Sequence, residues 1–515
     1  MSTQVLIIGG GATGTGLARD LALRGVGCIL AEKQDINAGA SGGNHGLLHS
    51  GARYIASDPA SARECRDEGA IIKRLAPQCV EETGGLFVAV KGDEEGYIAD
   101  FADRCAQCGI TAAAVDPKDA LEVEPSLSPD IIAAFAVEDA SIDPFKLSLD
   151  NLVQAGTLGT SQLLHHKVVG FDKRAGRIEA VRLMDFRHGT DVRVHADQIV
   201  NATGAWAGEV AAMAGAHINM VYSQGCLIVS QMRIGERVIN RLRKAADADI
   251  LVPAGTVSIF GTTSKRIDAP DRCRPTTAEI DAMIDDGMAM VPKLVDTRYI
   301  RAYAGVRPLV RSGNGSDDRA VSRGYSLLGH EADGLDNFIT ITGGKLTTYR
   351  LMAEKTADLV CRRLGNSTPC RTAKDPLPAS SEARYTEPGL TPKMWFKKND
   401  PSDLLLCECE MVPTSVFNEI AAFLTQNGHR PGLREMGQRS RVGKGPCQGS
   451  FCSLRMAAHM YNEGMLKDGE GIDELKDFLN ERWRGMQPLL WGPAVSQAEL
   501  QEALHCGLLG LDVSH

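Results

Sequence analysis

The run Val5-Leu-Ile-Ile-Gly-Gly-Gly-Ala-Thr-Gly14 decides the fold of this chain. Its four leading apolar residues predict a buried strand, and the glycines that follow match the pattern G-x-G-x-x-G at Gly9, Gly11 and Gly14. Residues 15–24 are rich in alanine and leucine and predict a helix. A strand, a glycine turn and a helix in this order are typical of the start of a dinucleotide-binding β-α-β unit.

Each glycine of this pattern has a separate physical reason. Gly9 permits the tight turn, Gly11 lets a pyrophosphate approach the backbone, and Gly14 lets the helix pack closely on the strand. The helix N-terminus then offers unpaired N–H groups to the phosphates. Glu32 follows a second predicted strand at 28–31 and is placed to accept hydrogen bonds from a ribose 2′-OH, which disfavours NADP. A turn that binds nothing is the alternative, and the spacing of Glu32 argues against it.

Two further glycine turns favour FAD over NAD, a choice that the first pattern leaves open. Short apolar strands at 198–201 and 338–342 both run directly into glycine-containing turns, at Gly204 and at Gly343-Gly344. These turns resemble the second and the late flavin-contact segments of flavoproteins. The alternation of strands and helices favours an α/β fold with a mainly parallel sheet, and a second, antiparallel sheet is expected between about residues 160 and 330.

Length and charge limit the class of protein. The chain has 515 residues, which suggests more than one domain, and its 56 basic and 65 acidic residues leave a net charge of −9. This balance argues against a nucleic-acid partner, which needs a basic surface. No stretch offers the roughly 18 uncharged apolar residues of a membrane-spanning helix. Because no secretory signal precedes the 14 cysteines, we expect a cytoplasmic enzyme whose cysteines are thiols or metal ligands.

Cations mark a candidate substrate pocket. The small-residue segment 40–54 contains a pair of histidines and Arg53, and Arg307 precedes a proline and is therefore expected in extended backbone. Lys345 follows the last glycine turn, and Arg323 is a further candidate. Converging cations suit a phosphate or a dicarboxylate, because arginine makes fork-shaped double contacts. Taken singly, each of these residues is more often a surface cation.

Several segments together resemble the FAD-dependent glycerol-3-phosphate dehydrogenase family over nearly the whole chain. They are residues 44–54, 249–253, 261–264, 304–309 and 342–350. The resemblance implies a D-amino-acid-oxidase-like FAD-binding fold interleaved with an antiparallel-sheet substrate domain. We therefore expect one body over 1–365, with FAD-binding parts at about 1–80, 145–215 and 300–365 and the substrate-capping sheet in between.

The same resemblance implies a reaction and residue roles. Glycerol 3-phosphate would lose its C2 hydride to flavin and its hydroxyl proton to a base, giving dihydroxyacetone phosphate. His49 is the leading base, with Arg53, Arg307 and Lys345 as catalytic cations, and Arg323 joins those cations in substrate binding. The alternative for His49 is a loop residue hydrogen-bonded to backbone. The residues expected to bind FAD are Gly9, Gly11, Gly14, Glu32, Ser41, Asn44, Gly204, Gly343 and Gly344.

A cysteine-containing tail follows a proline-rich stretch. Six of the 22 prolines lie within residues 366–402, which we interpret as a linker. Beyond it, Cys407 and Cys409 form C-x-C, and Cys447 and Cys452 form C-x4-C, with glycines around the second pair. These spacings favour a [2Fe-2S] cluster over zinc, the runner-up, which usually uses C-x2-C.

The tail resembles a small bacterioferritin-associated ferredoxin-like (BFD-like) [2Fe-2S] domain, expected over 403–465 with helices at 415–425 and 452–462. Residues 466–515 are expected to form a C-terminal extension, to which we assign no chemical role. A flavin beside a one-electron cluster indicates transfer of electrons to another protein. The resemblance implies other subunits of an anaerobic dehydrogenase complex, a quinone reached through them, and peripheral association with the inner membrane.

Two other functions are compatible with these patterns. One is a flavin dehydrogenase of the same fold that acts on a 2-hydroxy acid or an amino acid, for which a single arginine would serve the carboxylate. The other is a non-catalytic redox or iron-delivery adaptor that uses the cysteine tail. The adaptor would not need the histidines and arginine of segment 40–54 beside a flavin turn.

Overall fold

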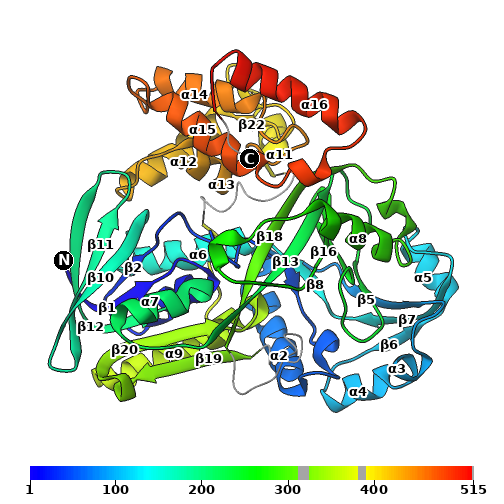
Figure 1. Cartoon of the computed structure of the whole chain (residues 1–515), viewed down its shortest axis with the longest axis horizontal. Coiled ribbons are helices and arrows are strands. Elements are labelled where there is room, and N and C mark those ends of the chain that lie inside the picture. Colours follow the sequence, from blue (N-terminus) through cyan, green and yellow to red (C-terminus); the bar gives the residue numbers. More distant parts are fainter. Residues whose placement is uncertain (311–323, 381–389, 513–515) are drawn as a thin grey trace.

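The computed structural model describes residues 1–310, 324–380 and 390–512 (Figure 1). The N-terminal glycine pattern lies at the centre of its first sheet. The parallel strands of this sheet are, in spatial order, β9 (Ser161–Leu163), β2 (Cys28–Ala31), β1 (Ser2–Ile8), β12 (Thr190–Asn201) and β20 (Leu335–Gly343). The order places the glycine turns after β1, β12 and β20 at the carboxyl edge of neighbouring strands, where α/β sheets bind their ligands.

Both faces of the first sheet are covered, which explains the continuous apolar run of β1. Val5 and Ile7 face one core together with α1 (Ala12–Leu23), α6 (Pro144–Thr157) and α9 (Tyr349–Leu364). Leu6 and Ile8 face a second core. That core is covered by the elements β10 (His166–Arg174), β11 (Arg177–Asp185) and α7 (Ala207–Ala214). Strands buried on both faces carry apolar residues at successive positions instead of alternating ones.

Helix α1 begins earlier than the sequence predicted. It starts at Ala12, so Gly14 lies in its first turn and Gly11 is its N-cap. The glycine pattern therefore builds the helix N-terminus itself, and does not merely precede it.

The second sheet is mostly antiparallel, as expected, but its span differs from the expected residues 160 to 330. It includes strands from residues 85–137, whereas the strands over 166–201 belong to the first sheet. Its strands are β5 (Gly85–Val90), β6 (Ala113–Val115), β7 (Ile131–Val137), β13 (Met220–Ser230), β14 (Val238–Arg241), β15 (Ile250–Ala254), β16 (Val257–Gly261), β17 (Lys265–Ile267) and β18 (Tyr299–Val310). One pair, β14 with β5, is parallel. Helix α8 (Thr277–Gly287) packs on this sheet through Ile280 and Met283.

The chain crosses between the two sheets several times. We expected residues from about 300 onward in the FAD-binding part, but β18 pairs with β13 along nearly its whole length and belongs to the second sheet. Between the sheets lie α2 (Pro59–Leu75) and a small sheet of β3 (Leu47–Leu48), β4 (Val80–Glu81) and β8 (Ala140–Ile142). The two sheets form one interleaved body, because neither is built from a continuous segment.

The stretch interpreted as a linker lies against the body where the structure describes it. Arg19 donates to the carbonyl of Asp375 at 3.0 Å, and the N–H of Ser380 donates to Asp150 at 2.7 Å. Leu377 is buried in the core beside α6. The prolines restrict the backbone of this stretch, but its residues still pack on the body. The proline content alone could not indicate this packing. Helix α11 (Leu390–Lys398) follows.

The tail folds around one core that includes both its cysteine part and its extension. Its elements are β21 (Leu405–Cys407), β22 (Val412–Pro413), α12 (Thr414–Gln426), α13 (Leu433–Arg439), α14 (Cys452–Asn462), α15 (Glu470–Trp483) and α16 (Pro493–Glu502). Helices α12 and α14 coincide closely with the predicted ones. Phe478 and Leu479 of the extension pack with Phe417 and Met456 in a single cluster. We call residues 403–512 the C-terminal domain because they share this core.

The C-terminal domain lies over the junction of the two sheets, at the top of Figure 1. Its helix α13 and the end of α15 are on the side that faces the body. Within the described residues, no helix combines the length and the apolar character that crossing a membrane requires.

Candidate active site

A cavity of about 2380 Å³ lies between the sheets and reaches the C-terminal domain. The first sheet contributes the turns at Gly9, Gly204 and Gly343, and the loop after Asp35 forms another wall. Strand β18 of the second sheet contributes residues 301–309. The cavity therefore brings together segments that are far apart in the sequence.

The glycine turn after β1 is too tightly packed for side chains. Gly9 has φ +115°, and a Cβ there would lie 2.5 Å from the carbonyl oxygen of Ala202. A Cβ at Gly14 would lie 1.9 Å from the carbonyl oxygen of Gly9. The close strand–helix packing expected for Gly14 is thus present, and Ala12 and Thr13 in the first turn of α1 line the cavity.

Glu32 directly follows β2 at the edge of this cradle. Its carboxylate accepts hydrogen bonds from the N–H of Gly10 at 2.7 Å and of Gln34 at 2.9 Å. Burial raises the pKa of Glu32, and these two N–H groups oppose the shift. A carboxylate has about four acceptor positions, so the two backbone bonds orient it and leave capacity for ribose hydroxyls.

The loop predicted to contact the cofactor lies at the N-terminus of α1. The Ser41 hydroxyl accepts from the N–H of Ala12 at 2.9 Å. Asn44 stabilises its own loop, since its amide donates to the carbonyl of Ser41 at 2.7 Å and its side-chain oxygen accepts from the N–H of Gly46 at 2.7 Å. Asn44 therefore acts on the cavity by fixing loop shape.

The turns after β12 and β20 lie side by side. The Thr342 hydroxyl donates to the carbonyl of Gly204 at 2.9 Å. Gly343 and Gly344 both have positive φ, at +84° and +70°, which side chains rarely adopt. Together with the first cradle, these turns give the cavity an elongated, side-chain-poor wall that fits a bound dinucleotide.

His49 is buried on the cavity wall. It is 8% exposed, its backbone N–H donates to the Thr347 hydroxyl at 3.1 Å, and its Nε2 lies 3.3 Å from the Tyr54 hydroxyl. The residue is therefore held by side chains from two segments. This arrangement suits a proton-transferring imidazole, and it also accounts for a purely structural histidine.

His45 is a site residue that sequence reasoning did not single out. Its Nδ1 is buried and has no hydrogen-bond partner among the described residues. Burial, with the charges of Arg307 and Arg53, lowers the pKa of His45 to about 3, so the ring is neutral near pH 7. The sequence did contain a signal, because His45 lies in the same small-residue segment as His49.

Three of the predicted cations, Arg53, Arg307 and Lys345, line the same cavity. Arg53 forms an ion pair with fully buried Asp249 at 2.8 Å, and Arg307 donates to the carbonyl of Thr263 at 3.0 Å and to the Thr262 hydroxyl. The Lys345 Nζ lies 4.7 Å from the centre of the Tyr54 ring. The fourth predicted cation, Arg323, lies outside the described residues.

The four predicted ligand cysteines form a ring in the C-terminal domain. Each thiol contacts two others, in the order Cys407, Cys409, Cys447, Cys452. The Sγ atoms of Cys407 and Cys409 are 3.7 Å apart, and those of Cys409 and Cys447 are 3.9 Å apart. No group of three or more His, Cys, Asp or Glu side chains in the described ranges has the arrangement of a single-ion site.

Backbone N–H groups favour the thiolate form at two of the four thiols, whereas the pKa values of Cys409 and Cys452 are raised by their thiol neighbours and by burial. Neighbouring thiols and the N–H groups of Glu410 and Gly443 lower the pKa of Cys407, and N–H groups of Gly449 and Phe451 act similarly on Cys447. A Cβ at Gly445 would lie 2.4 Å from the Cys409 Sγ. Four thiols with backbone donors and a glycine-lined approach fit an iron–sulfur cluster.

The first sheet carries three glycine turns that fit a dinucleotide, and the antiparallel second sheet forms the opposite wall of the cavity. These features define an FAD-dependent oxidoreductase. Residues 4–359 match the model of the FAD dependent oxidoreductase (DAO) family. Among solved structures, the glycerol-3-phosphate dehydrogenase of Bacillus halodurans in complex with FAD is similar, with a TM-score of 0.66 and 21% identity over 95% of this chain and 96% of that one. This likeness shows the fold.

Sequence relatives define the group more closely. The A subunit of the anaerobic glycerol-3-phosphate dehydrogenase of Escherichia coli K12 is 43% identical, over 99% of this chain and 97% of that protein. The corresponding A1 subunit of Haloferax volcanii is 37% identical, over 99% of this chain and 91% of that protein. The chain belongs to the FAD-dependent oxidoreductase family and, within it, to the family of anaerobic glycerol-3-phosphate dehydrogenase A subunits.

Proposed function

We propose that this protein is an FAD-dependent glycerol-3-phosphate dehydrogenase that oxidises sn-glycerol 3-phosphate to dihydroxyacetone phosphate. The observation that carries the proposal is one cavity whose walls include both the dinucleotide cradle and the cations Arg53, Arg307 and Lys345. Relatives spanning nearly the full chain have the same named activity.

Bound in the cradle, FAD would supply the acceptor for the hydride that leaves C2 of the substrate. The chain's own residues hold the two molecules in place. The N-terminus of α1, whose residues Ala12 and Thr13 line the cavity, would face the pyrophosphate, and Glu32 would accept hydrogen bonds from the ribose. The turns at Gly204 and Gly343 allow backbone to approach the rest of the cofactor without side-chain obstruction.

The substrate phosphate is assigned to the cations of the cavity. Arg307 has its guanidinium fixed by the Thr263 carbonyl and the Thr262 hydroxyl, so little side-chain freedom is lost on binding. Lys345 and Arg53 add charge, although Asp249 balances part of the charge on Arg53. A dianionic phosphate uses several cations, whereas the carboxylate of a 2-hydroxy acid or amino acid needs only one arginine.

His49 is assigned as the base that accepts the hydroxyl proton. A general base works best when its pKa is near the operating pH. His45 has a pKa of about 3 and is therefore a weak base, better suited to accepting a hydrogen bond. The hydrogen bond between His49 and Tyr54 orients the imidazole.

The electrons are proposed to leave through the cysteine ring. A [2Fe-2S] cluster held by Cys407, Cys409, Cys447 and Cys452 would take electrons singly and pass them on, with zinc as the alternative occupant. The acceptor is a partner subunit, and support comes from the relatives, which are themselves named as subunits of a larger dehydrogenase. Through such partners the protein would reach quinone and associate peripherally with the inner membrane from the cytoplasmic side.

Anaerobic flavin bleaching tests the substrate. Purified protein is mixed with glycerol 3-phosphate, with 2-hydroxy acids or with amino acids, and flavin absorbance is followed. We expect glycerol 3-phosphate alone to bleach the flavin at a catalytically useful rate. Bleaching by an acid or amino acid but not by glycerol 3-phosphate would replace the proposal with the same-fold alternative.

The occupant of the cysteine ring has a separate test. Iron and zinc are measured in protein purified without oxygen, and electron paramagnetic resonance is recorded after reduction. We expect two irons per chain and a paramagnetic signal in the reduced state. Zinc alone, with no signal, would contradict the cluster.

A further inference from the structure

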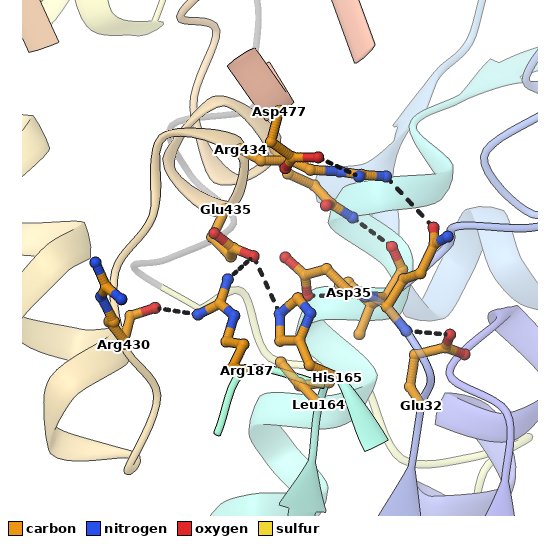
Figure 2. Close-up of polar contacts among 12 residues, drawn as sticks. Glu32, Asp35, Leu164, His165, Arg187, Arg430, Arg434, Glu435 and Asp477 are labelled. Carbon is orange, nitrogen blue, oxygen red and sulfur yellow. Dashed lines mark hydrogen bonds and ion pairs between the residues drawn. The ribbon is translucent and has the colours of Figure 1, made fainter. Parts of the chain in front are cut away.

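Helix α13 of the C-terminal domain packs on the turn that follows Glu32 (Figure 2). This turn, residues 33–37, continues the strand end that carries the ribose-binding carboxylate. The contact therefore joins the cysteine-bearing domain to the adenosine side of the FAD site, and it takes no part in the proposed catalytic chemistry.

A buried ion pair is the centre of the contact. The Arg439 guanidinium contacts both carboxylate oxygens of Asp35, at 2.5 and 3.0 Å, and the two residues are each only 2% exposed. Beside it the Gln438 amide donates to the carbonyl of Ile36, and Arg434 donates to the Gln34 side chain at 3.3 Å. Helix α13 thus bonds to three successive residues of the turn, Gln34, Asp35 and Ile36.

Helix α13 makes a second set of contacts with the body, and these also reach the turn at residues 33–37. Glu435 of α13 forms an ion pair with Arg187, and its carboxylate lies 3.0 Å from the His165 Nε2, as Figure 2 shows. The backbone N–H of His165 in turn donates to the carbonyl of Gln34 at 3.0 Å, and that of His166 to the carbonyl of Glu32 at 2.8 Å. The contact of Arg439 with Asp35 and the contacts of Glu435 therefore both hold the backbone that positions Glu32.

Helix α13 also forms part of the cavity wall. Arg434, Gly437 and Gln438 line the same cavity as Gly9 and Glu32. A ligand lying along the cradle is consequently covered by α13 when the C-terminal domain is docked.

We propose that α13 is the outer wall of the adenosine half of the FAD site, so that FAD retention and docking of the C-terminal domain strengthen each other. The inference rests on the proposed binding of FAD. Coupling between two binding equilibria is reciprocal, so FAD must stabilise the docked domain by the same factor by which docking strengthens FAD binding. Arg439 is a positioning residue here, because it acts through the turn and not on the reacting atoms.

Breaking the ion pair tests the first half of the coupling. Arg439→Met and Asp35→Asn each leave one buried charged or polar group without its partner, which is costly in a buried site. We expect the FAD dissociation constant, measured by the fluorescence of released flavin, to rise by about tenfold or more. Gln438→Ala is a milder variant, and it should raise the constant by a smaller factor.

Arg241→Met is the matched control. Arg241 forms a buried ion pair with Asp93 in the second sheet, with side chains 8% and 5% exposed, so its loss destabilises the body without touching α13. We expect its FAD dissociation constant to equal that of the unmodified protein. An equal rise in Arg241→Met, or no rise in Arg439→Met and Gln438→Ala, would overturn the proposal.

Hydrogen exchange tests the second half on the unmodified chain. Adding FAD to apoprotein should slow amide exchange in residues 433–439, and Arg439→Met should abolish this slowing. Unchanged exchange in α13 on FAD binding would refute the coupling. If the protein binds no FAD at all, the proposed function fails, whereas FAD binding that is indifferent to α13 removes only this inference.

Discussion

At the scale of single residues, the site depends on positions where one atom more would not fit. A Cβ at Gly14 would overlap the Gly9 carbonyl, whereas Glu32 and Ser41 satisfy backbone N–H groups of the same cradle. Binding of the cofactor is thus prepared by backbone geometry before any substrate-binding side chain takes part.

Gly14→Ala should yield protein with little or no bound flavin. The new methyl group would lie 1.9 Å from the Gly9 carbonyl oxygen, so the turn and α1 must separate. Flavin absorbance per chain after purification measures the effect. Gly96→Ala in the helix Glu95–Ala99 meets no atom within 4 Å and should retain full flavin content. Equal flavin content in both variants would contradict the proposed cradle.

Arg307→Gln should raise KM for glycerol 3-phosphate by about 10- to 100-fold, as expected from the loss of a charge-assisted contact. Flavin content should stay unchanged, because Arg307 contacts Thr262 and Thr263 in the second sheet. Arg266→Gln replaces an exposed arginine on β17 of the same sheet and should have normal kinetics. A KM unaffected by Arg307→Gln would remove this residue from the phosphate site.

His49→Asn and His45→Asn should differ in the kinetic parameter that they change. Loss of a general base lowers kcat by about 10² to 10⁴-fold, which we expect for His49. His45 is already neutral above its pKa of about 3, so its loss should change KM more than kcat and leave the pH profile in place. The reverse pattern would assign the base to His45.

At the scale of elements, the loop that carries Cys447 is supported by the extension that follows it. Phe478 of α15 is 1% exposed, and its ring lies against Gly443 and Gly449 on either side of Cys447. The extension, for which sequence patterns indicated no chemical role, therefore supports the loop that carries Cys447.

Phe478→Ala should destabilise the C-terminal domain by about 3–5 kcal/mol and lower its iron content. The cavity left under Gly443 and Gly449 lets the loop move, so the thiols lose their common arrangement. Chemical unfolding and metal analysis measure the two effects. Leu500→Ala on α16, where the leucine is 56% exposed, should change neither by more than about 0.5 kcal/mol. Normal iron content in Phe478→Ala would show that the cysteine ring does not depend on the extension.

At the scale of the whole molecule, the flavin cradle and the cysteine ring lie in different parts: the cradle in the interleaved body, the ring in the C-terminal domain. The flavin cradle lies at the first sheet, the cations proposed to bind substrate line the cavity between the two sheets, and the four thiols lie in the C-terminal domain. Oxidation of substrate and onward transfer of electrons should therefore be separable by mutation.

Cys409→Ser should keep flavin bleaching by glycerol 3-phosphate and abolish transfer to the natural acceptor. Cys409 is the exposed member of the ring, and serine is a poor iron ligand, while the flavin cavity contains none of these thiols. Stopped-flow absorbance follows bleaching, and electron paramagnetic resonance follows the cluster. Cys506→Ser, outside the ring, is the control and should change neither. Unimpaired onward transfer in Cys409→Ser would exclude the ring from the electron path.

Local pattern alone sufficed for the class of fold and for most of the candidate site. The apolar run before Gly9, the glycine spacing and Glu32 predict the cradle, because these features act over fewer than 30 residues of adjacent chain. The cysteine spacings and the two tail helices are similarly local. Arg53, Arg307 and Lys345 could be chosen as cations with a common role because each lies within a short, distinctive segment, although no local pattern places the three in one cavity.

Only the tertiary structure decided which distant residues meet. It brought β18 into the second sheet, paired Arg53 with Asp249, and revealed His45 as a neutral ring among cations. It also joined Arg439 to Asp35 across some 400 residues of sequence. The sequence pattern determines each segment's own conformation and its apolar faces, whereas burial and pairing of charges depend on packing between segments, which no local period encodes.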